Sequence, residues 1–411
     1  MKNQRLKSIL FIASAFLLYG CNEQFLEKGL SPIQSNPSGL FSQSPIASNK
    51  TEVPNDAYIV VYKDQTTDNE IEDEVGEIDK SEGVKADHVY KNAIKGFAAR
   101  LSPSAYNKLK NNAKVAFIEK DQVMSANVTV IPPSWGIDRI DQASLPLSKS
   151  FTYTSNGAGV DAYIIDTGIL ISHTDFGGRA EGGYSSIGAI TNWVDANGHG
   201  THVAGTVGGT NYGVAKNVNL IAVRVLDANG SGSTSGVIDG INWAISHHKT
   251  KSGTAVANMS LGGGASSALD LAVSNAVAAN IVMCVAAGNS SANAANYSPA
   301  RVAAAITVGA TGAGTNYDAY AAYSNYGSIV DILAPGSSIT SDWILSNSST
   351  AILSGTSMAT PHVTGVVAQY LSKNPGAKPS AVEAFIKNTS TKNKITGVRS
   401  GTVNALLFSN N

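Results

Sequence analysis

The alternation of apolar and polar residues first becomes regular near residue 58. From there the pattern predicts a strand, an acidic surface helix, a strand or hairpin, a helix and a strand, over residues 58–62, 68–79, 89–99, 102–111 and 115–118. This order, β-α-β-β-α-β, is typical of the ferredoxin-like arrangement. We therefore expect a small α+β domain over residues 57–126.

The rest of the chain, residues 127–411, carries a different pattern. Segments that are apolar on both faces alternate with helical stretches, at residues 161–165, 220–223, 256–259, 281–286 and 305–308. Strands of this kind are typical of a parallel sheet covered by helices on both sides. The sequence thus predicts a three-layer α/β/α domain with a mostly parallel sheet. The 40 glycines of the whole chain fit an α/β protein with many tight turns between strands and helices.

Length and charge agree with two domains and limit the kind of partner. With 411 residues, of which 43% are hydrophobic, the chain exceeds the ~250 to 300 residues that one core usually spans. The formal net charge is −1, and Lys and Arg are scattered along the chain. This composition argues against a nucleic-acid groove and against a polybasic membrane face, so we expect a polypeptide partner.

The N-terminus has the pattern of a bacterial export signal. Three basic residues precede an apolar run at residues 9–18, which is shorter than the ~20 residues of a membrane-spanning helix. We therefore assign residues 1–20 as a signal peptide and expect export, to the periplasm or the medium. Residues 21–56, rich in Ser, Pro and Asn, are expected to form a disordered tether.

The two cysteines have different predicted roles. Cys21 follows Leu-Tyr-Gly and resembles the cysteine of a lipobox, which is diacylated and becomes the new N-terminus. The alternative is an ordinary signal peptide that contains a cysteine. Cys284 lies in an apolar run, where we expect it to be a small buried core residue. Acylation of Cys21 would tie the precursor to the bacterial envelope.

Three short segments supply an acid, a base and a nucleophile. Asp166 lies in Ile-Asp-Thr-Gly after a predicted strand, His199 in Asn-Gly-His-Gly-Thr-His, and Ser357 in Gly-Thr-Ser-Met-Ala-Thr. A serine hydroxyl becomes nucleophilic when a neutral imidazole takes its proton, and a carboxylate fixes that imidazole. The order Asp, His, Ser is that of subtilisin. The α/β-hydrolases place serine first in Gly-x-Ser-x-Gly, a motif that Ala359 interrupts here.

These segments resemble those of the subtilisin-like serine peptidases, peptidase family S8, and within them the proteinase K branch. The resemblance runs over residues 128–411 and includes further segments at residues 260–264, 285–289, 296–300 and 323–327. Residues 57–126 resemble the inhibitory propeptide of that family, of the inhibitor I9 type, most clearly at residues 96–99 and 115–119. The resemblance implies a subtilisin-like peptidase domain over residues 127–411.

The resemblance also implies the rest of an active site. The Asn289 side-chain amide and the Ser357 backbone N–H would donate to the oxyanion. The residues expected to hold the substrate as an extra strand and to wall its first pocket are Gly230, Ser231, Gly232, Ser260, Leu261, Gly262, Ala287 and Gly288. None of them is acidic, so we expect broad specificity, with a small or apolar residue before the cut bond. Thr234 stands where relatives often carry an aromatic residue, which leaves the extended specificity open.

The family implies structural calcium and no cofactor for catalysis. Asp331 would bind one ion together with the carbonyls of Ala303 and Ala305, and the alternative is an aspartate that caps a turn. A second calcium loop of bacterial relatives is matched by three residues, Asp138, Asp141 and Gln142. Lys149 replaces an oxygen ligand of that loop, and a nearby ammonium group opposes a bound cation.

Other histidines are expected to be structural. His202 is part of no His-Glu-x-x-His motif and has no evident third ligand, so we expect it to pack in the interior. His362 is expected to pack within the helix that follows the nucleophile. His247 and His248 lie where a helix is expected to end, which suits cations at the negative end of its dipole.

The sequence therefore predicts an exported serine endopeptidase, made as a precursor that its own propeptide folds and inhibits. We expect self-cleavage near residues 126–128 and a monomeric mature enzyme. Two rival functions remain, a catalytically silent lipoprotein that binds peptides and an esterase of the α/β-hydrolase type. Fluorophosphonate labelling of Ser357 would oppose the first rival, and a comparison of casein with short-chain esters would test the second.

Overall fold

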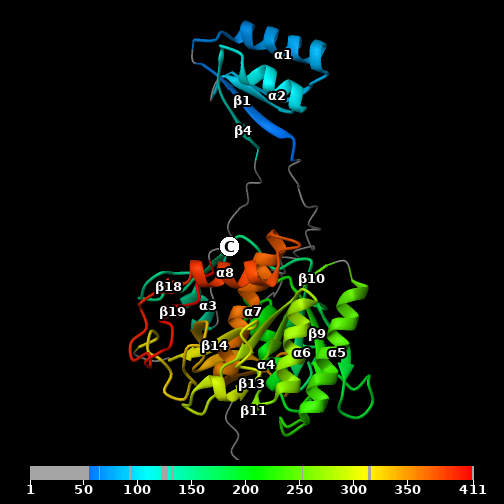
Figure 1. Cartoon of the computed structure of the whole chain (residues 1–411), viewed down its shortest axis with the longest axis vertical. Coiled ribbons are helices and arrows are strands. Elements are labelled where there is room, and N and C mark those ends of the chain that lie inside the picture. The colour runs from blue at the N-terminus through cyan, green and yellow to red at the C-terminus, as the bar shows by residue number, and fades with distance from the viewer. Residues whose placement is uncertain are drawn as a thin grey trace, which may run out of the picture. The chain divides into compact units, whose positions relative to one another are not determined.

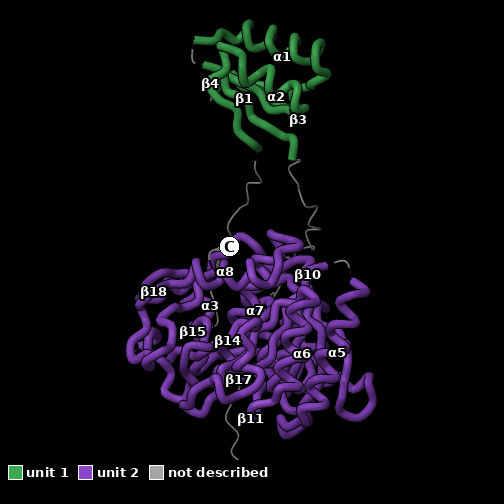
Figure 2. Tube along the Cα trace, viewed as in Figure 1, with its two compact units in different colours: residues 1–123 green, residues 124–411 purple. Residues whose placement is uncertain are grey.

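A computed structural model describes residues 55–63, 65–91, 94–121, 128–130, 134–251, 253–312 and 316–409 of the chain. The chain divides into two compact units, Met1–Val123 and Met124–Asn411 (Figure 2). The expected signal peptide, Cys21 and nearly all of the expected tether lie outside the described residues. Residues 126 and 127, beside the expected processing bond, lie outside them as well.

Unit 1 is a four-stranded antiparallel sheet with two helices. Its elements, in chain order, are β1 (Ala57–Tyr62), α1 (Asp68–Glu82), β2 (Ala86–Tyr90), β3 (Gly96–Arg100), α2 (Pro103–Lys110) and β4 (Val115–Lys120). The strands lie in the order β2-β3-β1-β4, and apolar side chains of both helices pack on one face of the sheet (Figure 1). The predicted order β-α-β-β-α-β is confirmed.

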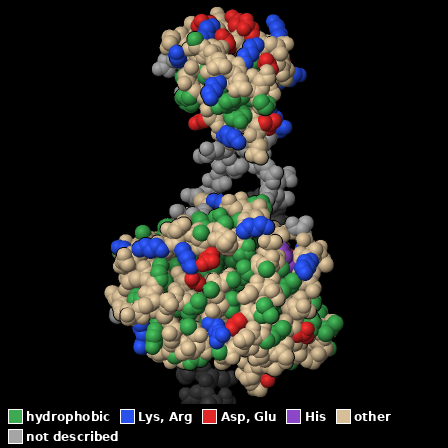
Figure 3. Space-filling view, viewed as in Figure 1, with side chains coloured by type: hydrophobic (Ala, Val, Ile, Leu, Met, Phe, Trp, Pro, Cys, Tyr) green, Lys and Arg blue, Asp and Glu red, His purple; other side chains and the backbone are tan. Residues whose placement is uncertain are grey.

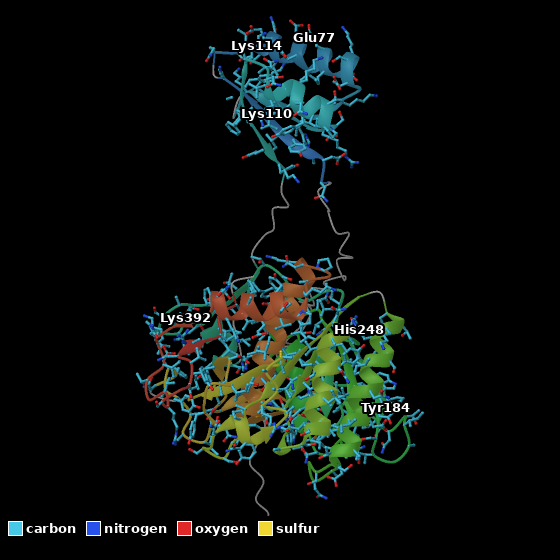
Figure 4. The ribbon with its side chains drawn as sticks, viewed as in Figure 1. Glu77, Lys110, Lys114, Tyr184, His248 and Lys392 are labelled. Atoms are coloured by element: carbon cyan, nitrogen blue, oxygen red, sulfur yellow. The ribbon has the colours of Figure 1, made fainter. Side chains whose placement is uncertain are left out.

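Local signals in the sequence explain where the helices of unit 1 begin and end. Thr67 and Glu70 form a reciprocal capping box at the start of α1, and Gly83 ends the helix in the left-handed conformation, with φ of 69°. Lys114, which directly precedes β4 (Figure 4), forms ion pairs with Glu70 and Glu74 of α1, at 3.4 and 3.3 Å. These surface ion pairs contribute little free energy each, so the apolar core holds the unit together.

Unit 2 is built on a nine-stranded sheet in the order β18-β19-β15-β14-β12-β10-β7-β9-β8. Its strands are β7 (Val160–Asp166), β8 (Ala180–Ser185), β9 (Asn219–Arg224), β10 (Thr254–Met259), β12 (Ile281–Ala286), β14 (Ile306–Thr311), β15 (Ile332–Pro335), β18 (Thr391–Lys392) and β19 (Ala405–Leu406). All pairs are parallel except β18 with β19. The five apolar segments of the sequence correspond to β7, β9, β10, β12 and β14, so the predicted parallel sheet is confirmed.

Helices cover both faces of this sheet. Alternate side chains of β7 point into two separate cores, one shared with α4 (His199–Gly208) and α7 (Thr356–Lys373), the other with α5 (Thr234–Thr250) and α6 (Ser267–Ala278) (Figure 1). The three-layer α/β/α architecture is therefore confirmed. His247 and His248 lie in the last turn of α5, as the sequence predicts (Figure 4).

Short elements complete unit 2. They are β5 (Val128–Val130), α3 (Trp135–Ile140), β6 (Phe151–Tyr153), η1 (Thr174–Phe176), β11 (Gly263–Gly264), η2 (Ala294–Asn296), β13 (Tyr297–Ser298), β16 (Ile339–Asp342), β17 (Thr350–Leu353) and α8 (Pro379–Thr389). In the described part of the chain, no helix has the length and apolar character needed to cross a membrane. Basic and acidic side chains are interspersed on the visible surfaces (Figure 3).

The hairpin formed by β16 and β17 places a buried carboxyl group against α4. Asp342, the last residue of β16, is 0% exposed. A Cβ atom on Gly205 of α4 would lie only 2.7 Å from Asp342 Oδ2, so the strand and the helix approach closely there. Asp342 therefore lies directly against the helix that begins with His199.

The surroundings of Asp342 favour its neutral form. Its carboxyl group faces His173, at 3.6 Å, and the Asp175 carboxylate. His173 Nε2 donates to the Ser349 carbonyl and His173 Nδ1 accepts from the Asp175 N–H, so the network assigns a neutral imidazole. Burial, and then repulsion by Asp175, raise the pKa of Asp342 to about 8, although Arg179 opposes the shift.

This buried acid predicts a pH-dependent stability. In the unfolded chain Asp342 ionises near pH 4, whereas in the folded chain it keeps its proton to about pH 8. The contribution of Asp342 to the free energy of unfolding should therefore fall by up to ~1.4 kcal/mol per pH unit between these values and level off above them. Asp342→Asn should remove this dependence, so that its Tm gain over wild type is larger at pH 8 than at pH 4.

Thermal unfolding of inhibitor-blocked processed enzyme, followed from pH 4 to 9, measures the effect. Asp239→Asn, which neutralises an exposed carboxylate on α5, is the matched control. An Asp342→Asn curve parallel to that of wild type would contradict the prediction.

Candidate active site

The acid of the site stands at the end of strand β7, in the interior of the sheet. Asp166 is its last residue and is 0% exposed, at the carboxyl edge of the sheet, where open α/β sheets keep their sites. Its Oδ1 accepts the Thr167 N–H at 2.8 Å. Its Oδ2 is buried and has no hydrogen-bond partner among the described residues.

The base is the first residue of α4. His199 Nδ1 donates to Asp166 Oδ1 at 2.7 Å, which leaves the lone pair of Nε2 free to accept a proton. Gly198 precedes it with φ of 110°, a conformation that favours glycine. Gly200 allows the helix to approach β7, because a Cβ atom there would lie 2.2 Å from the Gly168 carbonyl oxygen.

Nearby charges set the proton affinity of His199. Partial burial of the ring lowers its pKa, but the Asp166 carboxylate and then Asp195 outweigh that effect, so the pKa of His199 is raised above its ordinary value. The side chain is 25% exposed, so it remains open to the cleft. The arrangement stabilises the imidazolium that forms when the ring takes a proton.

The nucleophile lies in the first turn of α7. The Ser357 hydroxyl donates to the Ser260 carbonyl at 3.1 Å, and the Ser260 hydroxyl donates to the Ser357 carbonyl at 2.8 Å. Among the described residues, no hydrogen bond joins Ser357 to His199. Catalytic hydrogen bonds are often loose or absent before substrate binds, and a rotation about the Cα–Cβ bond would redirect the hydroxyl group.

Two N–H donors lie beside the nucleophile. Asn289 Oδ1 accepts from the Thr356 N–H at 2.8 Å and from the Thr356 hydroxyl at 2.9 Å, so the network assigns the free amide nitrogen as a donor. A Cβ atom on Gly355 would lie 3.3 Å from Asn289 Nδ2, so this nitrogen borders the turn before Ser357. The Ser357 N–H belongs to the first turn of a helix, whose N–H groups have no partner within the helix.

Two adjoining cavities contain the expected substrate-binding residues. The first, of about 580 Å³, is lined by His199, Gly230, Ser231, Gly232, Thr234, Ser260, Leu261 and Gly262 among others. The second, of about 310 Å³, is lined by Ser260, Leu261, Gly262, Ala287, Gly288, Asn289 and Ser357 among others. None of the described residues that line either cavity is acidic. The two expected substrate-binding segments therefore border one continuous cleft that contains the base and the nucleophile.

The first expected calcium residue is engaged by protein groups. Asp331 Oδ1 accepts from the Lys387 ammonium at 2.7 Å, and Asp331 Oδ2 accepts from the Thr307 N–H at 2.8 Å. Ala303 and Ala305 lie in the turn that leads into β14. The Lys387 ammonium group thus binds one of the two Asp331 oxygens that a calcium ion would need.

The second expected calcium loop is rich in oxygen atoms. Asp138 accepts from the backbone N–H groups of Ser148 and Lys149, and Gln142 Oε1 also accepts from Ser148. Asp141 Oδ2 accepts from a backbone N–H, while its Oδ1 is buried without a partner among the described residues. Burial, together with Asp138, raises the pKa of Asp141 to about 6. Lys149 is exposed and is bound there through its backbone.

Other predicted structural residues are buried. His202 Nε2 donates to the Ile339 carbonyl at 3.0 Å, and His362 Nδ1 donates to the Met358 carbonyl at 2.8 Å. Burial lowers the pKa of each imidazole to about 4. Cys284 is a buried free thiol whose pKa burial raises to about 12. Among the described residues, no three His, Cys, Asp or Glu side chains form a group suited to a metal ion.

Sequence reasoning missed two residues that support the site. Thr356 orients the Asn289 amide, and Asp195 binds groups around both Asp166 and His199. The available signal for Asp195 was an anion three residues before Gly198, the residue that caps α4. Such an anion is expected at a helix N-terminus whose capping residue has no side chain.

Comparisons with known proteins agree with this geometry. Residues 155–404 match the Subtilase family, and residues 57–127 match Peptidase inhibitor I9. An "Extracellular serine proteinase" from Thermus sp. (strain Rt41A) is 51% identical over 80% of this chain and 78% of its own length. "Proteinase R" from Parengyodontium album is 38% identical over 93% and 97%. A crystal structure of a cold adapted subtilisin-like serine proteinase has a TM-score of 0.64 and 50% identity, and covers 67% of this chain and 97% of its own.

Proposed function

This chain belongs to the subtilase family and is a subtilisin-like serine peptidase with an inhibitor I9 propeptide, and we propose that Asp166, His199 and Ser357 are its catalytic triad. The observation that carries the assignment is the 2.7 Å hydrogen bond from His199 Nδ1 to Asp166 Oδ1, in the cleft that Ser357 also lines. The peptidase hydrolyses peptide bonds in proteins.

The proposed reaction begins when the Ser357 hydroxyl turns from the Ser260 carbonyl toward His199 Nε2. His199 takes the hydroxyl proton as Ser357 Oγ attacks the peptide carbonyl, and Asp166 stabilises the imidazolium. His199 then gives its proton to the leaving amine, and the acyl group stays on Ser357. A water molecule, activated by His199 in the same way, hydrolyses the acyl-enzyme and restores the hydroxyl group.

We propose that Asn289 Nδ2 and the Ser357 N–H stabilise the oxyanion of the tetrahedral intermediate. Asn289→Ala should lower kcat about 10²- to 10³-fold with little change in KM, a figure that comes from subtilisin itself. Steady-state kinetics on processed enzyme, with active sites counted by fluorophosphonate, measure the loss. Asn289→Asp should lower kcat at least as much, because it lacks the amide N–H and places a negative charge beside the oxyanion, whereas Asn242→Ala, on the exposed side of α5, should leave kcat unchanged. A change confined to KM would refute the oxyanion assignment.

We propose that the substrate lies as an extra strand between residues 230–232 and 260–262. Main-chain hydrogen bonding makes such recognition tolerant of sequence. The 310 Å³ cavity beside Ser357, walled by Ala287 and Gly288 among others, has no charged side chain in its lining. This lining favours a small or apolar residue before the cut bond rather than Lys or Arg, because an unpaired cation would lose its hydration there.

We propose that residues 57–126 form the inhibitory propeptide and residues 127–411 the peptidase domain. The propeptide would assist folding, inhibit the peptidase domain, and leave a monomeric enzyme when it is removed. The inhibitor match over residues 57–127, directly before the family match of the peptidase, supports this order.

Replacement of the nucleophile tests the activity and the self-cleavage together. Wild-type protein should convert to a shorter form that hydrolyses casein, whereas Ser357→Ala should stay at full length and remain inert, because no other group can form the acyl-enzyme. Gel analysis and casein turnover measure both outcomes. A Ser357→Ala protein that is processed and active would reject the triad. A processed wild type that fluorophosphonate does not label would favour a peptide-binding lipoprotein instead.

We propose export of the chain and acylation at Cys21, on the sequence alone. The lipid would then anchor the tether and the propeptide to the membrane. Wild-type protein and Ser357→Ala should therefore be found in different cell fractions. Full-length Ser357→Ala should stay with the membrane, and the processed wild-type enzyme should be soluble. Processed enzyme that still carries lipid would contradict this assignment.

We propose that structural calcium binds the loop around Asp138, Asp141 and Gln142, rather than Asp331 with Ala303 and Ala305. The buried, unpartnered Asp141 Oδ1 beside other oxygen atoms fits a hard cation, which prefers mixed oxygen ligands. The Lys387 ammonium bound to Asp331 opposes a cation at the other position.

Removal of calcium should lower the Tm of inhibitor-blocked processed enzyme, because a ligand that binds only the folded state adds about 2.7 kcal/mol at a concentration 100 times its Kd. Asp141→Asn should abolish the difference between calcium and chelator, whereas Asp331→Asn should retain it. Calorimetry with and without calcium measures the shift. The reverse pattern, or a Tm that chelation does not change, would contradict the choice of site.

A further inference from the structure

Asp195 is a buried carboxylate at the junction of the two segments that carry the acid and the base. It is 5% exposed. Its two oxygens accept five hydrogen bonds of 2.7–2.9 Å, from Thr167 Oγ1, Asn197 N, Gly198 N, Thr201 N and Thr201 Oγ1. One donor therefore belongs to the residue after Asp166, and the others flank His199 on both sides.

The start of α4 explains why an anion is held there. Gly198, the N-cap residue, has no side chain to satisfy the exposed N–H groups of the first turn. Asp195 caps the helix instead, because its Oδ2 accepts the Thr201 N–H and its Oδ1 accepts the Gly198 N–H. Its negative charge also lies at the positive end of the helix dipole.

Two threonine hydroxyls extend the network from Asp195 across the site. Thr167 Oγ1 donates to Asp195 and accepts the Gly200 N–H at 2.9 Å. Thr201 Oγ1 donates to Asp195 and accepts the Leu170 N–H at 3.0 Å. Each hydroxyl thus links the turn after β7 to the first turn of α4, and Asp195 fixes the direction in which both hydroxyls donate.

We propose that Asp195 is a positioning residue that holds the Asp166 carboxylate and the His199 ring in register for proton transfer. This role rests on the proposed triad. The Asp166–His199 hydrogen bond spans two elements, and the network around Asp195 is a second, independent connection between the same elements. Loss of this connection would let the helix start shift relative to β7, and small shifts of a catalytic group reduce the rate strongly.

The charge of Asp195 adds a second effect that a purely structural residue would not have. The charged and titratable groups that act on His199 are Asp166 on β7, Asp195 in the preceding loop and His202 on α4. The two carboxylates favour the protonated ring, and His202 is neutral at working pH. Removal of the Asp195 charge should therefore lower the pKa of His199 and move the acid limb of activity to lower pH.

The test uses full-length precursors of Asp195→Asn and Thr167→Val. Variants that do not process themselves are cut by immobilised wild-type enzyme, which is then removed, and active sites are counted with fluorophosphonate. Asp195→Asn should lower kcat about 10- to 100-fold with KM nearly unchanged. It should also shift the acid limb of kcat/KM down by about half a pH unit. Thr167→Val should lower kcat without moving the limb, because the charge remains.

The control is Asp161→Asn, which removes a carboxylate at the other end of β7, bound to Asn219. It should leave both kcat and the acid limb unchanged. The proposal is overturned when Asp195→Asn keeps the wild-type kcat per titrated site, or when its kcat falls with no movement of the limb. Activity that persists in Ser357→Ala would instead reject the triad itself, so the two failures are distinguishable.

Discussion

The hydrogen bond between His199 and Asp166 is the constraint on which the site depends. It joins the end of one strand to the start of a helix 33 residues later, so it forms only when β7 and α4 are in direct contact. Gly198 and Gly200 make this approach possible, since side chains there would meet Trp343 and the Gly168 carbonyl. The core around β7 and α4 supplies the rigid frame.

The parallel sheet gathers the remaining groups. In β7 and its neighbour β10 the strands run the same way, so the segments that follow them, including Thr167 and Ser260, emerge at one edge. Helix α7 packs on that sheet and presents Ser357 in its first turn, where the reciprocal hydrogen bonds with Ser260 tie the nucleophile to a wall of the cleft. Catalytic and substrate-binding residues thus share one support.

Much of this could be predicted from sequence, because buried strands such as β7 and β12 are apolar on both faces and the triad segments are distinctive. Strand β8 was not predicted because it contains Gly182, Gly183 and polar residues, which give no apolar pattern. Its backbone pairing with β9 defines it instead. The network of Asp195, the Lys387–Asp331 pair and the resting direction of the Ser357 hydroxyl depend on distant contacts. Local pattern offers a signal for the contact of Asp195 with the start of α4, but none for its contact with Thr167 or for the other two features.

The two buried imidazoles, His202 and His362, have a consequence for the environment in which the enzyme survives. In the folded chain the pKa of each imidazole is about 4, whereas in the unfolded chain each is protonated below about pH 6.5. As the pH falls from 6.5 to 4, protonation of these two groups therefore stabilises the unfolded chain relative to the folded one. They stand on the helices that carry the base and the nucleophile. Acid therefore acts on the scaffold as well as on the chemistry, and the effect of these two imidazoles opposes that of Asp342.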